Sequence, residues 1–260
     1  MTPIAVDTRE SHALYCDRLE PAILRRRSAE TALESLMKPG QFVAVAGNIG
    51  VGKTHLTTLL ANQLGWRAYY EPVINNPYLN DFYSDMDRWS FHLQVYFLSK
   101  RFEIHREMVG SDESCIQDRT IYEDKEIFAT TLYRQGNMPE RDYENYTALF
   151  DAMTSFLRTP DLIVYLRAGV GTLLDRIGCR GRDCERDIDP VYLEALNDAY
   201  EDWSDRAKAE TTVLTLETDS MNLVTDEDAI HEALGRILGH LGPDTEPVHS
   251  LGVEAGLLAG

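Results

Sequence analysis

Eight consecutive residues, Gly47–Thr54, have the sequence GNIGVGKT and match the spacing G-x-x-x-x-G-K-[S/T]. They follow an apolar run, Gln41–Ala46, and precede an expected helix, His55–Leu64. Glycines at this spacing let backbone N–H groups turn toward an anion, and the helix N-terminus adds its positive end. In such loops the lysine reaches the β- and γ-phosphates of a nucleoside triphosphate and the next hydroxyl binds Mg²⁺. We therefore expect Lys53 on the phosphates and Thr54 on magnesium, the alternative being a glycine-rich turn. The residues expected to hold the phosphates are Gly47, Asn48, Ile49, Gly50, Val51, Gly52, Lys53 and Thr54.

Two acidic residues end the next two apolar runs: Glu71 ends 67–71 and Asp118 ends 115–118. The carboxyl ends of parallel strands meet at the edge of the sheet where ligands bind, which is also the edge of the phosphate loop. A carboxylate at position 71 can take a proton from an acceptor hydroxyl, and one at position 118 can hold Mg²⁺. Arg119 can reach a phosphate or the acceptor oxygen. The alternatives are a solvated glutamate and a local Asp118–Arg119 ion pair.

The densest basic segment of this acidic chain lies between positions 176 and 186. Its four arginines are Arg176, Arg180, Arg182 and Arg186, with Gly178 and Gly181 among them. A planar guanidinium group binds phosphate oxygens in bidentate fashion. The composition predicts a lid that closes over phosphates, and the alternative is a solvated helix paired with its own acidic residues.

Strands and helices alternate between these candidate residues. The five expected strands are Gln41–Ala46, Arg67–Glu71, Cys115–Asp118, Asp161–Arg167 and Thr212–Leu216. Continuously apolar strands are typical of a parallel sheet that is buried on both faces. The expected helices besides the one after the phosphate loop are Arg88–Val109, Asp142–Leu157, Pro190–Ala209 and Asp226–Leu241. This order predicts an α/β fold of three layers, with a doubly wound parallel five-stranded sheet. Phe91, Val95, Leu98 and Phe102 define the expected apolar face of the long helix.

The ends of the chain differ from this core. We expect residues 1–38 to form an N-terminal extension with a polar helix from about Ser11 to Met37, whose arginines 25–27 face solvent or an anionic partner. Residues 39–242 form the expected domain, and 243–260 a flexible tail.

Composition excludes several classes of function. The chain has 260 residues, and its 43 acidic and 25 basic residues give a formal net charge of −18. This excess of acid disfavours sequence-independent binding to nucleic acid, whose phosphates would be repelled. The longest uncharged apolar run, residues 41–51, is too short to span a membrane, and no secretory leader pattern opens the chain. Four scattered cysteines are typical of reduced thiols, so we expect a cytoplasmic protein without membrane or nucleic-acid partners.

Together these segments resemble the deoxyribonucleoside kinase family of P-loop kinases over about residues 42–241. The segments that carry the resemblance are GNIGVGKT at 47–54, Glu71-Pro72-Val73, Asn76-Pro77-Tyr78-Leu79, Phe82-Tyr83, Trp89-Ser90-Phe91 with Gln94, Asp118-Arg119-Thr120 and RIGCRGRDCE at 176–185. The segment DRTIYED at 118–124 is most similar to the bacterial deoxyadenosine/deoxycytidine kinases.

The resemblance implies Mg²⁺- and ATP-dependent 5′-phosphorylation of a deoxyribonucleoside in the salvage of DNA precursors, by a homodimer. It implies that Glu71 is the general base, that Lys53 and Arg119 stabilise the transferring group with Asp118 on the metal, and that the arginines at 176, 180 and 182 hold phosphates. The remaining substrate residues that it implies are Val73, Tyr83, Gln94, Lys100, Asp124, Phe128 and Glu185. Tyr83 and Glu185 are assigned to the 3′-hydroxyl, Gln94 and Asp124 to the base, and Phe128 to stacking on it.

Lys100 lies where relatives often carry arginine, and we expect it to pair with Asp124. A buried carboxylate only accepts hydrogen bonds, so Asp124 favours bases with an exocyclic amine. We expect deoxyadenosine first, then deoxycytidine or deoxyguanosine, with thymidine poor. Two alternatives remain open at this point: a thymidylate-type nucleoside monophosphate kinase, and a catalytically silent, kinase-like nucleotide-binding subunit. For Asp124 the alternative is that it only caps its helix.

Overall fold

The computed structural model describes residues 40–71, 76–109, 111 and 113–241 of the chain. Five strands form one parallel sheet in the order β2-β3-β1-β4-β5, which confirms the predicted α/β class. The strands are β1 (Phe42–Gly47), β2 (Arg67–Tyr69), β3 (Cys115–Asp118), β4 (Leu162–Arg167) and β5 (Thr212–Glu217). The central β1 is buried along its whole length, as expected for a strand covered on both faces.

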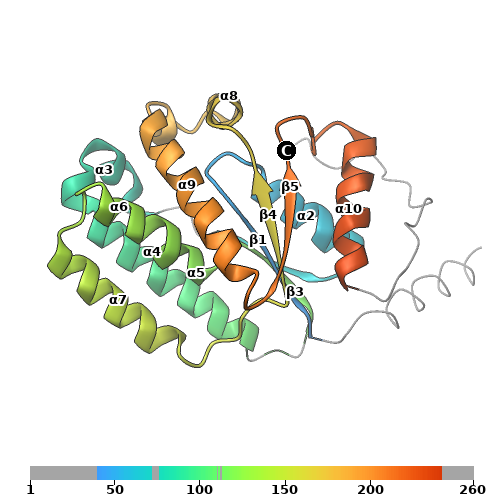
Figure 1. The fold of residues 1–260 in the computed structure, drawn as a ribbon, viewed down its shortest axis with the longest axis horizontal. Helices are drawn as coiled ribbons and strands as arrows, with labels where there is room; N and C mark the ends of the chain where they lie inside the picture. The colour runs from blue at the N-terminus through green and yellow to red at the C-terminus, as the bar shows by residue number, and fades with distance from the viewer. Residues whose placement is uncertain (1–39, 72–75, 110, 112, 242–260) are drawn as a thin grey trace, which may run out of the picture.

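Helices cover both faces of this sheet (Figure 1). The helices of ordinary length are α2 (Lys53–Leu64), α4 (Met86–Val109), α7 (Glu140–Thr154), α8 (Val170–Arg180), α9 (Pro190–Ala207) and α10 (Glu227–Leu241). In Figure 1, α4, α7 and α9 lie to the left of the sheet and α2 and α10 to its right. The predicted elements are thus confirmed, with ends that shift by a few residues. The second strand stops at Tyr69, so Glu71 lies just beyond its end.

Short helical segments, which the sequence analysis did not resolve, surround the carboxyl edge of the sheet. They are α3 (Leu79–Ser84), α5 (Ile121–Glu123), η1 (Asp124–Ala129), α6 (Thr130–Arg134) and η2 (Asp183–Glu185). The segment η1 is a π-helix and η2 is a single 3₁₀ turn. Single π-helical turns such as η1 are frequent at functional sites. The three segments α5, η1 and α6 form one continuous helical stretch after β3.

The buried face of α4 differs from the predicted one. Of the four apolar residues expected to form it, only Leu98 is fully buried, and Phe91, Val95 and Phe102 are half-buried. The face that points inward also carries polar residues: Ser90, Gln94, Arg101 and His105. The prediction was wrong because α4 covers a polar cavity rather than only an apolar sheet.

Some expectations fall outside this description. The predicted helix from Ser11 to Met37, the tail 243–260 and Val73 all lie outside the described residues. Among the helices that the structure describes, none is long and apolar enough to cross a bilayer.

Candidate active site

The loop between β1 and α2 lies at the carboxyl end of the central strand, where the glycines at 47, 50 and 52 all have positive φ. A side chain at two of them would meet backbone or core atoms: a Cβ on Gly47 would lie 2.6 Å from the Leu166 carbonyl oxygen, and one on Gly50 would lie 2.7 Å from Ile177 Cγ1. The loop therefore requires glycine for both conformation and space.

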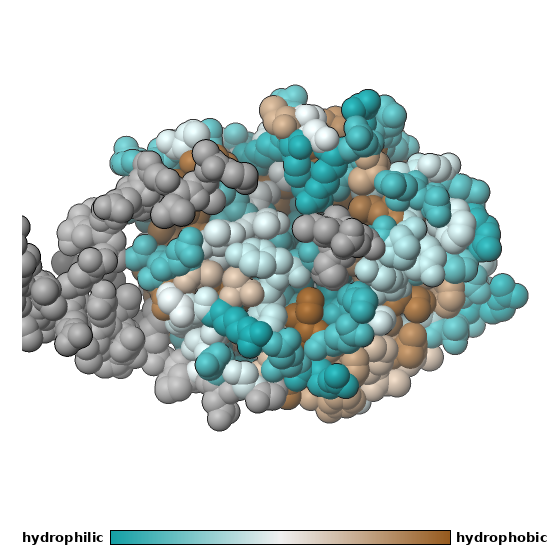
Figure 2. Space-filling model, turned by 180° about the vertical axis from the view of Figure 1, so that it is seen from behind, coloured by the Kyte–Doolittle hydropathy of each residue, from teal (hydrophilic) through white to brown (hydrophobic). Residues whose placement is uncertain are grey.

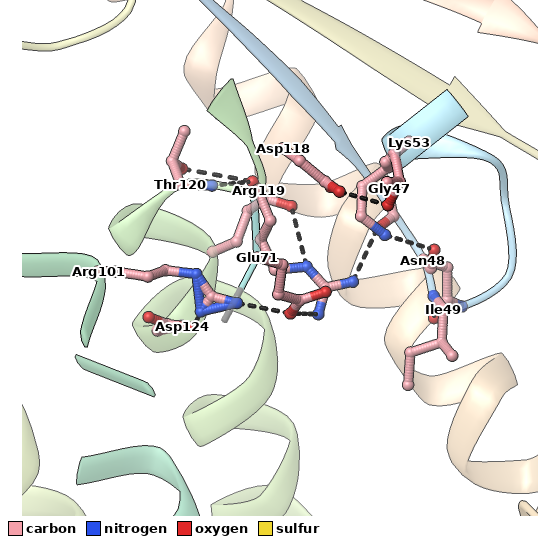
Figure 3. Close-up of polar contacts among 12 residues, drawn as sticks. Gly47, Asn48, Ile49, Lys53, Glu71, Arg101, Asp118, Arg119, Thr120 and Asp124 are labelled. Carbon is pink, nitrogen blue, oxygen red and sulfur yellow. Dashed lines mark hydrogen bonds and ion pairs between the residues drawn. The ribbon is translucent and has the colours of Figure 1, made fainter. Parts of the chain in front are cut away.

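Asn48 fixes this loop to helix α9. Its Nδ2 donates to the Leu193 carbonyl at 2.9 Å and to Asn197 Oδ1 at 2.7 Å. Its own Oδ1 accepts from the Ile49 N–H. Lys53 Nζ donates to the Asn48 carbonyl at 2.9 Å, so the ammonium group lies inside the loop (Figure 3). Burial and the charge of Arg119 lower the pKa of Lys53 to about 8.

The structure brings Thr54 and Asp118 together from two separate segments. Thr54 Oγ1 donates to Asp118 Oδ2 at 2.5 Å. The other carboxylate oxygen, Asp118 Oδ1, is buried without a hydrogen-bond partner among the described residues. Burial raises the pKa of Asp118, while the nearby Lys53 opposes the shift. A hydroxyl and an unpartnered carboxylate oxygen are the hard donors that Mg²⁺ takes when phosphates and waters complete its shell.

Glu71 lies between two arginines that come from different elements (Figure 3). Its Oε1 accepts from Arg101 Nη2 at 2.6 Å and from Arg119 Nη1 at 3.1 Å. Burial alone would raise the pKa of Glu71, but the charges of Arg119, Arg101 and Lys53 outweigh it and lower this pKa well below its usual range. The group is therefore a carboxylate at neutral pH, and it faces the phosphate loop.

Arg119 connects this carboxylate to the loop. Its Nη2 donates to the Gly47 carbonyl at 3.3 Å, and its guanidinium lies 4.4 Å from the centre of the Phe128 ring. The guanidinium thus has the phosphate loop on one side and the wall of a cavity on the other.

That cavity has a volume of about 570 Å³ and extends from the phosphate loop to α4 and η1. It brings together most of the predicted residues. Those that line it are Ile49, Gly50, Gly52, Lys53, Thr54, Glu71, Tyr83, Gln94, Asp118, Arg119, Asp124, Phe128, Arg176, Arg180, Arg182 and Glu185. The predicted residues Gly47, Asn48, Val51 and Lys100 are not among its described lining residues.

Polar atoms without partners lie at the far end of the cavity. Gln94 Oε1 and Asp124 Oδ2 are buried and have no hydrogen-bond partner within the described chain. Asp124 Oδ1 accepts from Arg101 Nη1 at 2.6 Å. Burial raises the pKa of Asp124 to about 7, against the opposing charge of Arg101. Two unpartnered acceptors on one wall suit a ligand that brings N–H groups.

The predicted pairing of Lys100 with Asp124 is wrong. Lys100 pairs with Glu103 at 2.9 Å on the surface of α4, and its side chain is 39% exposed. The adjacent Arg101 takes the expected position, and it joins Asp124 and Glu71 through separate nitrogens. The sequence contained the signal. In a helix, Arg101 lies seven positions after Gln94 and returns to the same face within about 20°, whereas Lys100 lies six positions after it and misses that face by about 120°. Sequence reasoning overlooked Arg101 because it used the wrong helix register.

The arginines of the predicted lid contact the protein itself. Arg180 and Arg182 both donate to the buried Glu185, the latter at 3.2 Å. Arg176 donates to the Val51 carbonyl at 3.1 Å and to the Thr218 and Met221 carbonyls. Closure of this segment over phosphates stays a prediction.

Arg176 also borders a second cavity, of about 470 Å³, beside the phosphate loop. This cavity is lined by Val51, Gly52, His55, Thr172, Asp175 and the segment 218–224. His55 lines both cavities and approaches the Leu223 carbonyl with its Nε2 at 2.6 Å. The phosphate loop therefore separates two ligand-sized spaces.

Comparison with known proteins agrees with this geometry. The family model for deoxynucleoside kinases matches residues 43–240. The deoxyadenosine/deoxycytidine kinase of Bacillus subtilis (strain 168) is 41% identical over 197 residues, which cover 75% of this chain and 90% of that protein. The deoxyguanosine kinase of the same bacterium is 34% identical over 194 residues, covering 74% and 93%. A structure of deoxyadenosine kinase from M. mycoides with dCMP and dCDP bound has a TM-score of 0.67 at 28% identity, and covers 77% of this chain and 98% of that one.

The chain belongs to the deoxynucleoside kinase family. It is a kinase that phosphorylates nucleosides, a nucleotide-binding transferase on a five-stranded parallel sheet.

Proposed function

We propose that the protein transfers the γ-phosphoryl group of ATP to the 5′-hydroxyl of a deoxyribonucleoside in cytoplasmic deoxynucleotide salvage, with deoxyadenosine as the preferred substrate. The observation that carries the proposal is the position of Glu71, a half-buried carboxylate that lines the 570 Å³ cavity beside the phosphate loop. Phosphoryl transfer needs an acceptor oxygen in line with the γ-phosphate and charge stabilisation around it. A nucleoside in this cavity would place its 5′-oxygen at the Glu71 end.

Each of these residues has a separate role in the proposed transfer. The phosphate loop and Lys53 bind the β- and γ-phosphates. Glu71 accepts the proton of the 5′-hydroxyl as the new oxygen–phosphorus bond forms and the bond to the β-phosphate oxygen breaks. Arg119 stabilises the charge on the transferring group, since its guanidinium lies between Glu71 and the Gly47 carbonyl. ADP and the nucleoside 5′-monophosphate are the products.

Thr54 and Asp118 would hold the Mg²⁺ ion. Their paired oxygens and the unpartnered Asp118 Oδ1 fit a hard cation that keeps phosphate and water ligands. The ion, when bound, neutralises charge on the β- and γ-phosphates. Thr54 is the second residue of α2, so the metal and the helix N-terminus would act on the same phosphates.

The far end of the cavity supports a purine or cytosine base. Gln94 and Asp124 offer unpartnered acceptors to an exocyclic amine, and Phe128 offers a ring face. Tyr83 and Glu185 line the same cavity, and we assign them to the 3′-hydroxyl of the sugar. Deoxyadenosine comes first because relatives named deoxyadenosine kinases are among the most similar, and deoxycytidine or deoxyguanosine come next.

A panel of acceptors with labelled ATP tests this function. The panel contains the four deoxyribonucleosides and thymidine 5′-monophosphate. We expect label on deoxyadenosine above all others and none on the monophosphate, because its 5′-phosphate would meet the Glu71 carboxylate, whose arginine partners are already engaged. Faster labelling of the monophosphate would instead support the thymidylate-type reading.

We further propose that the enzyme is a homodimer formed through α4 and α7. On α4, Phe91, Val95 and Phe102 are half-buried, while Leu149 on α7 and Phe156 just after it are 40% and 63% exposed. Phe102 and Phe156 are in edge contact, with centroids 6.0 Å apart. Figure 2 shows brown side chains at its lower right, on the side of the molecule where these helices lie. Such an apolar surface suits a second copy.

Light scattering at micromolar concentration tests the dimer. We expect twice the chain mass for the native protein and the chain mass for a Phe156→Glu variant. A monomeric native protein would contradict this proposal and leave the kinase assignment intact.

The described core also suggests which part of the chain suffices for activity. We propose that residues 39–242 form the kinase domain, with 1–38 as an extension and 243–260 as a tail. A chain beginning at Met37 is expected to fold and phosphorylate deoxyadenosine at the native rate. Loss of activity would place the extension in the functional unit.

A further inference from the structure

Arg119 has a backbone that its neighbours must hold in place. It has φ of 64°, and it is the one non-glycine residue with positive φ in the described part of the chain. Its N–H donates to the Val45 carbonyl of the central strand at 3.0 Å. A left-handed conformation is unfavourable for a side-chain-bearing residue and persists where the surroundings over-determine it. Contacts with neighbouring groups must therefore hold Arg119 in this conformation.

Glu123, four residues further on, contacts both the backbone and the side chain of this region. It is fully buried. Its Oε1 accepts from the Thr120 N–H at 2.8 Å and from Thr120 Oγ1 at 3.3 Å, which caps the helix directly after Arg119. Its Oε2 lies 4.0 Å from Arg119 Nε, a buried nitrogen without a hydrogen-bond partner among the described residues. Glu123 thus faces the guanidinium at a different nitrogen from Glu71.

Tyr200 reaches Glu123 from helix α9. Its hydroxyl donates to Glu123 Oε2 at 2.8 Å, and both side chains are fully buried. The Tyr200 ring stacks on Tyr165 at 5.7 Å and meets Phe128 edge-on at 6.5 Å. The same helix carries Leu193 and Asn197, which hold Asn48 of the phosphate loop. Helix α9 therefore contacts both the phosphate loop and the carboxylate beside Arg119.

We propose that Glu123 and Tyr200 are positioning residues that set the orientation of the Arg119 guanidinium for phosphoryl transfer. The hydroxyl of Tyr200 occupies Glu123 Oε2 and keeps this oxygen from forming a hydrogen bond with Arg119 Nε. Without it, a buried acceptor would be left unpaired and would turn to the nearest donor. The guanidinium would then move away from Glu71 and the Gly47 carbonyl. This inference rests on the transfer role proposed above for Arg119.

A Tyr200→Phe variant removes only the hydroxyl and keeps the ring. We expect kcat to fall about 10-fold, because small displacements of an oriented group lower the rate steeply. The KM values for ATP and deoxyadenosine should stay within about twofold, since Tyr200 is not among the described residues that line either cavity. A general loss of stability would instead reduce the active fraction, which active-site titration and thermal melting measure.

Tyr165→Phe is the matched control. In the native protein the Tyr165 ring stacks on Tyr200, and the Tyr165 hydroxyl donates to a carboxylate oxygen, Glu201 Oε1, at 2.9 Å. That carboxylate pairs with Arg167 at the surface rather than with Arg119. We expect this variant to keep kcat within about twofold of the native enzyme.

Glu123→Gln provides a second variant, because Gln keeps an acceptor for Thr120 but removes the charge beside Arg119. We expect a similar fall in kcat. The double variant of Glu123→Gln with Tyr200→Phe should have a kcat no lower than that of the slower single variant, since both substitutions act through one contact. If Tyr200→Phe does not fold, the kcat of Glu123→Gln decides alone. A kcat of either folded variant equal to that of Tyr165→Phe would overturn the inference.

Arg119→Lys separates this inference from the proposed function. A kcat within twofold of the native value in this variant would overturn the role of Arg119 and the inference with it. A large loss there, together with an unaffected Tyr200→Phe, would overturn the positioning role alone.

Discussion

The two ends of the main cavity are built in different ways. The phosphate end consists largely of backbone from one continuous loop, and its ammonium group, Lys53 Nζ, donates to the Asn48 carbonyl and forms no ion pair within the described residues. The base end consists of side chains from two separate segments, α4 and η1, and its charges are already paired: Arg101 holds Asp124 and Glu71.

This difference suits the two kinds of ligand. A triphosphate is an anion, and a loop of N–H groups with a lysine ammonium inside it binds this anion through charge. A nucleoside is neutral, so an unpaired protein charge facing its base would lose hydration without gaining a partner. Among the described residues that line the base end, the buried polar atoms without a hydrogen-bond partner are Gln94 Oε1, Asp124 Oδ2 and Arg101 Nε. Specificity therefore depends on side-chain placement, and phosphate binding on main-chain shape.

Glu71 lies where the two ends meet, and its loss should have the largest effect. In Glu71→Gln we expect kcat to fall by about 10²–10⁴-fold, the usual range for a positioned base, while ATP still binds. Steady-state kinetics and equilibrium ATP binding measure this. The control is Glu103→Gln, which alters an exposed acid on α4. A kcat within threefold of native would show that proton transfer is not the role of Glu71.

Asp124 tests whether the base end carries the selectivity. We expect thymidine to be poorer than deoxyadenosine by about 10²-fold or more, since each unpaired buried polar group costs about 1–3 kcal/mol. Asp124→Ala should lower kcat/KM for deoxyadenosine and narrow this gap to below about 10-fold. Competition between the two nucleosides measures the ratio. An unchanged ratio in the variant, or a native preference for thymidine, would contradict the assignment.

Arg101 and Lys100 are adjacent in sequence and sharpen the comparison further. Arg101→Lys keeps the charge but loses the fork that reaches two carboxylates, so kcat/KM for deoxyadenosine should fall about 10–50-fold. Lys100→Ala should leave it within twofold, because that side chain is at the surface. Equal effects of the two substitutions would refute the helix register described above.

The phosphate end should respond to pH through Lys53. Burial and Arg119 lower the pKa of Lys53 to about 8, so the free enzyme carries this charge below pH 8 and loses it above. We expect kcat/KM for ATP to fall toward a limit of about tenfold per pH unit above 8, since this ratio reports the free enzyme. Lys53→Arg, which stays charged, should lower activity but remove this decline. A native profile that is flat to pH 9.5 would contradict the shift.

The sequence by itself determined the parallel sheet, the phosphate loop and the identity of most residues around the cavity. The sheet, the loop and the acidic residues that directly follow a strand depend on local patterns of apolar runs and glycine spacing. The residues at the base end were identified through the resemblance to the deoxyribonucleoside kinase family. The sequence also assigned both Thr54 and Asp118 to a magnesium site, because the phosphate loop and the end of segment 115–118 are expected at the same carboxyl edge of a parallel sheet.

Only the tertiary structure decided which side chains meet across elements. It selected Arg101 over Lys100, set the inward face of α4, formed the π-helix that buries both Asp124 and Phe128, and brought Tyr200 to Glu123 across 77 positions of sequence. The rotation of a helix about its axis and the contacts of a buried hydroxyl follow from packing against distant segments. Local spacing contains no information on that packing, and a shift of one residue turns a helical side chain by about 100°.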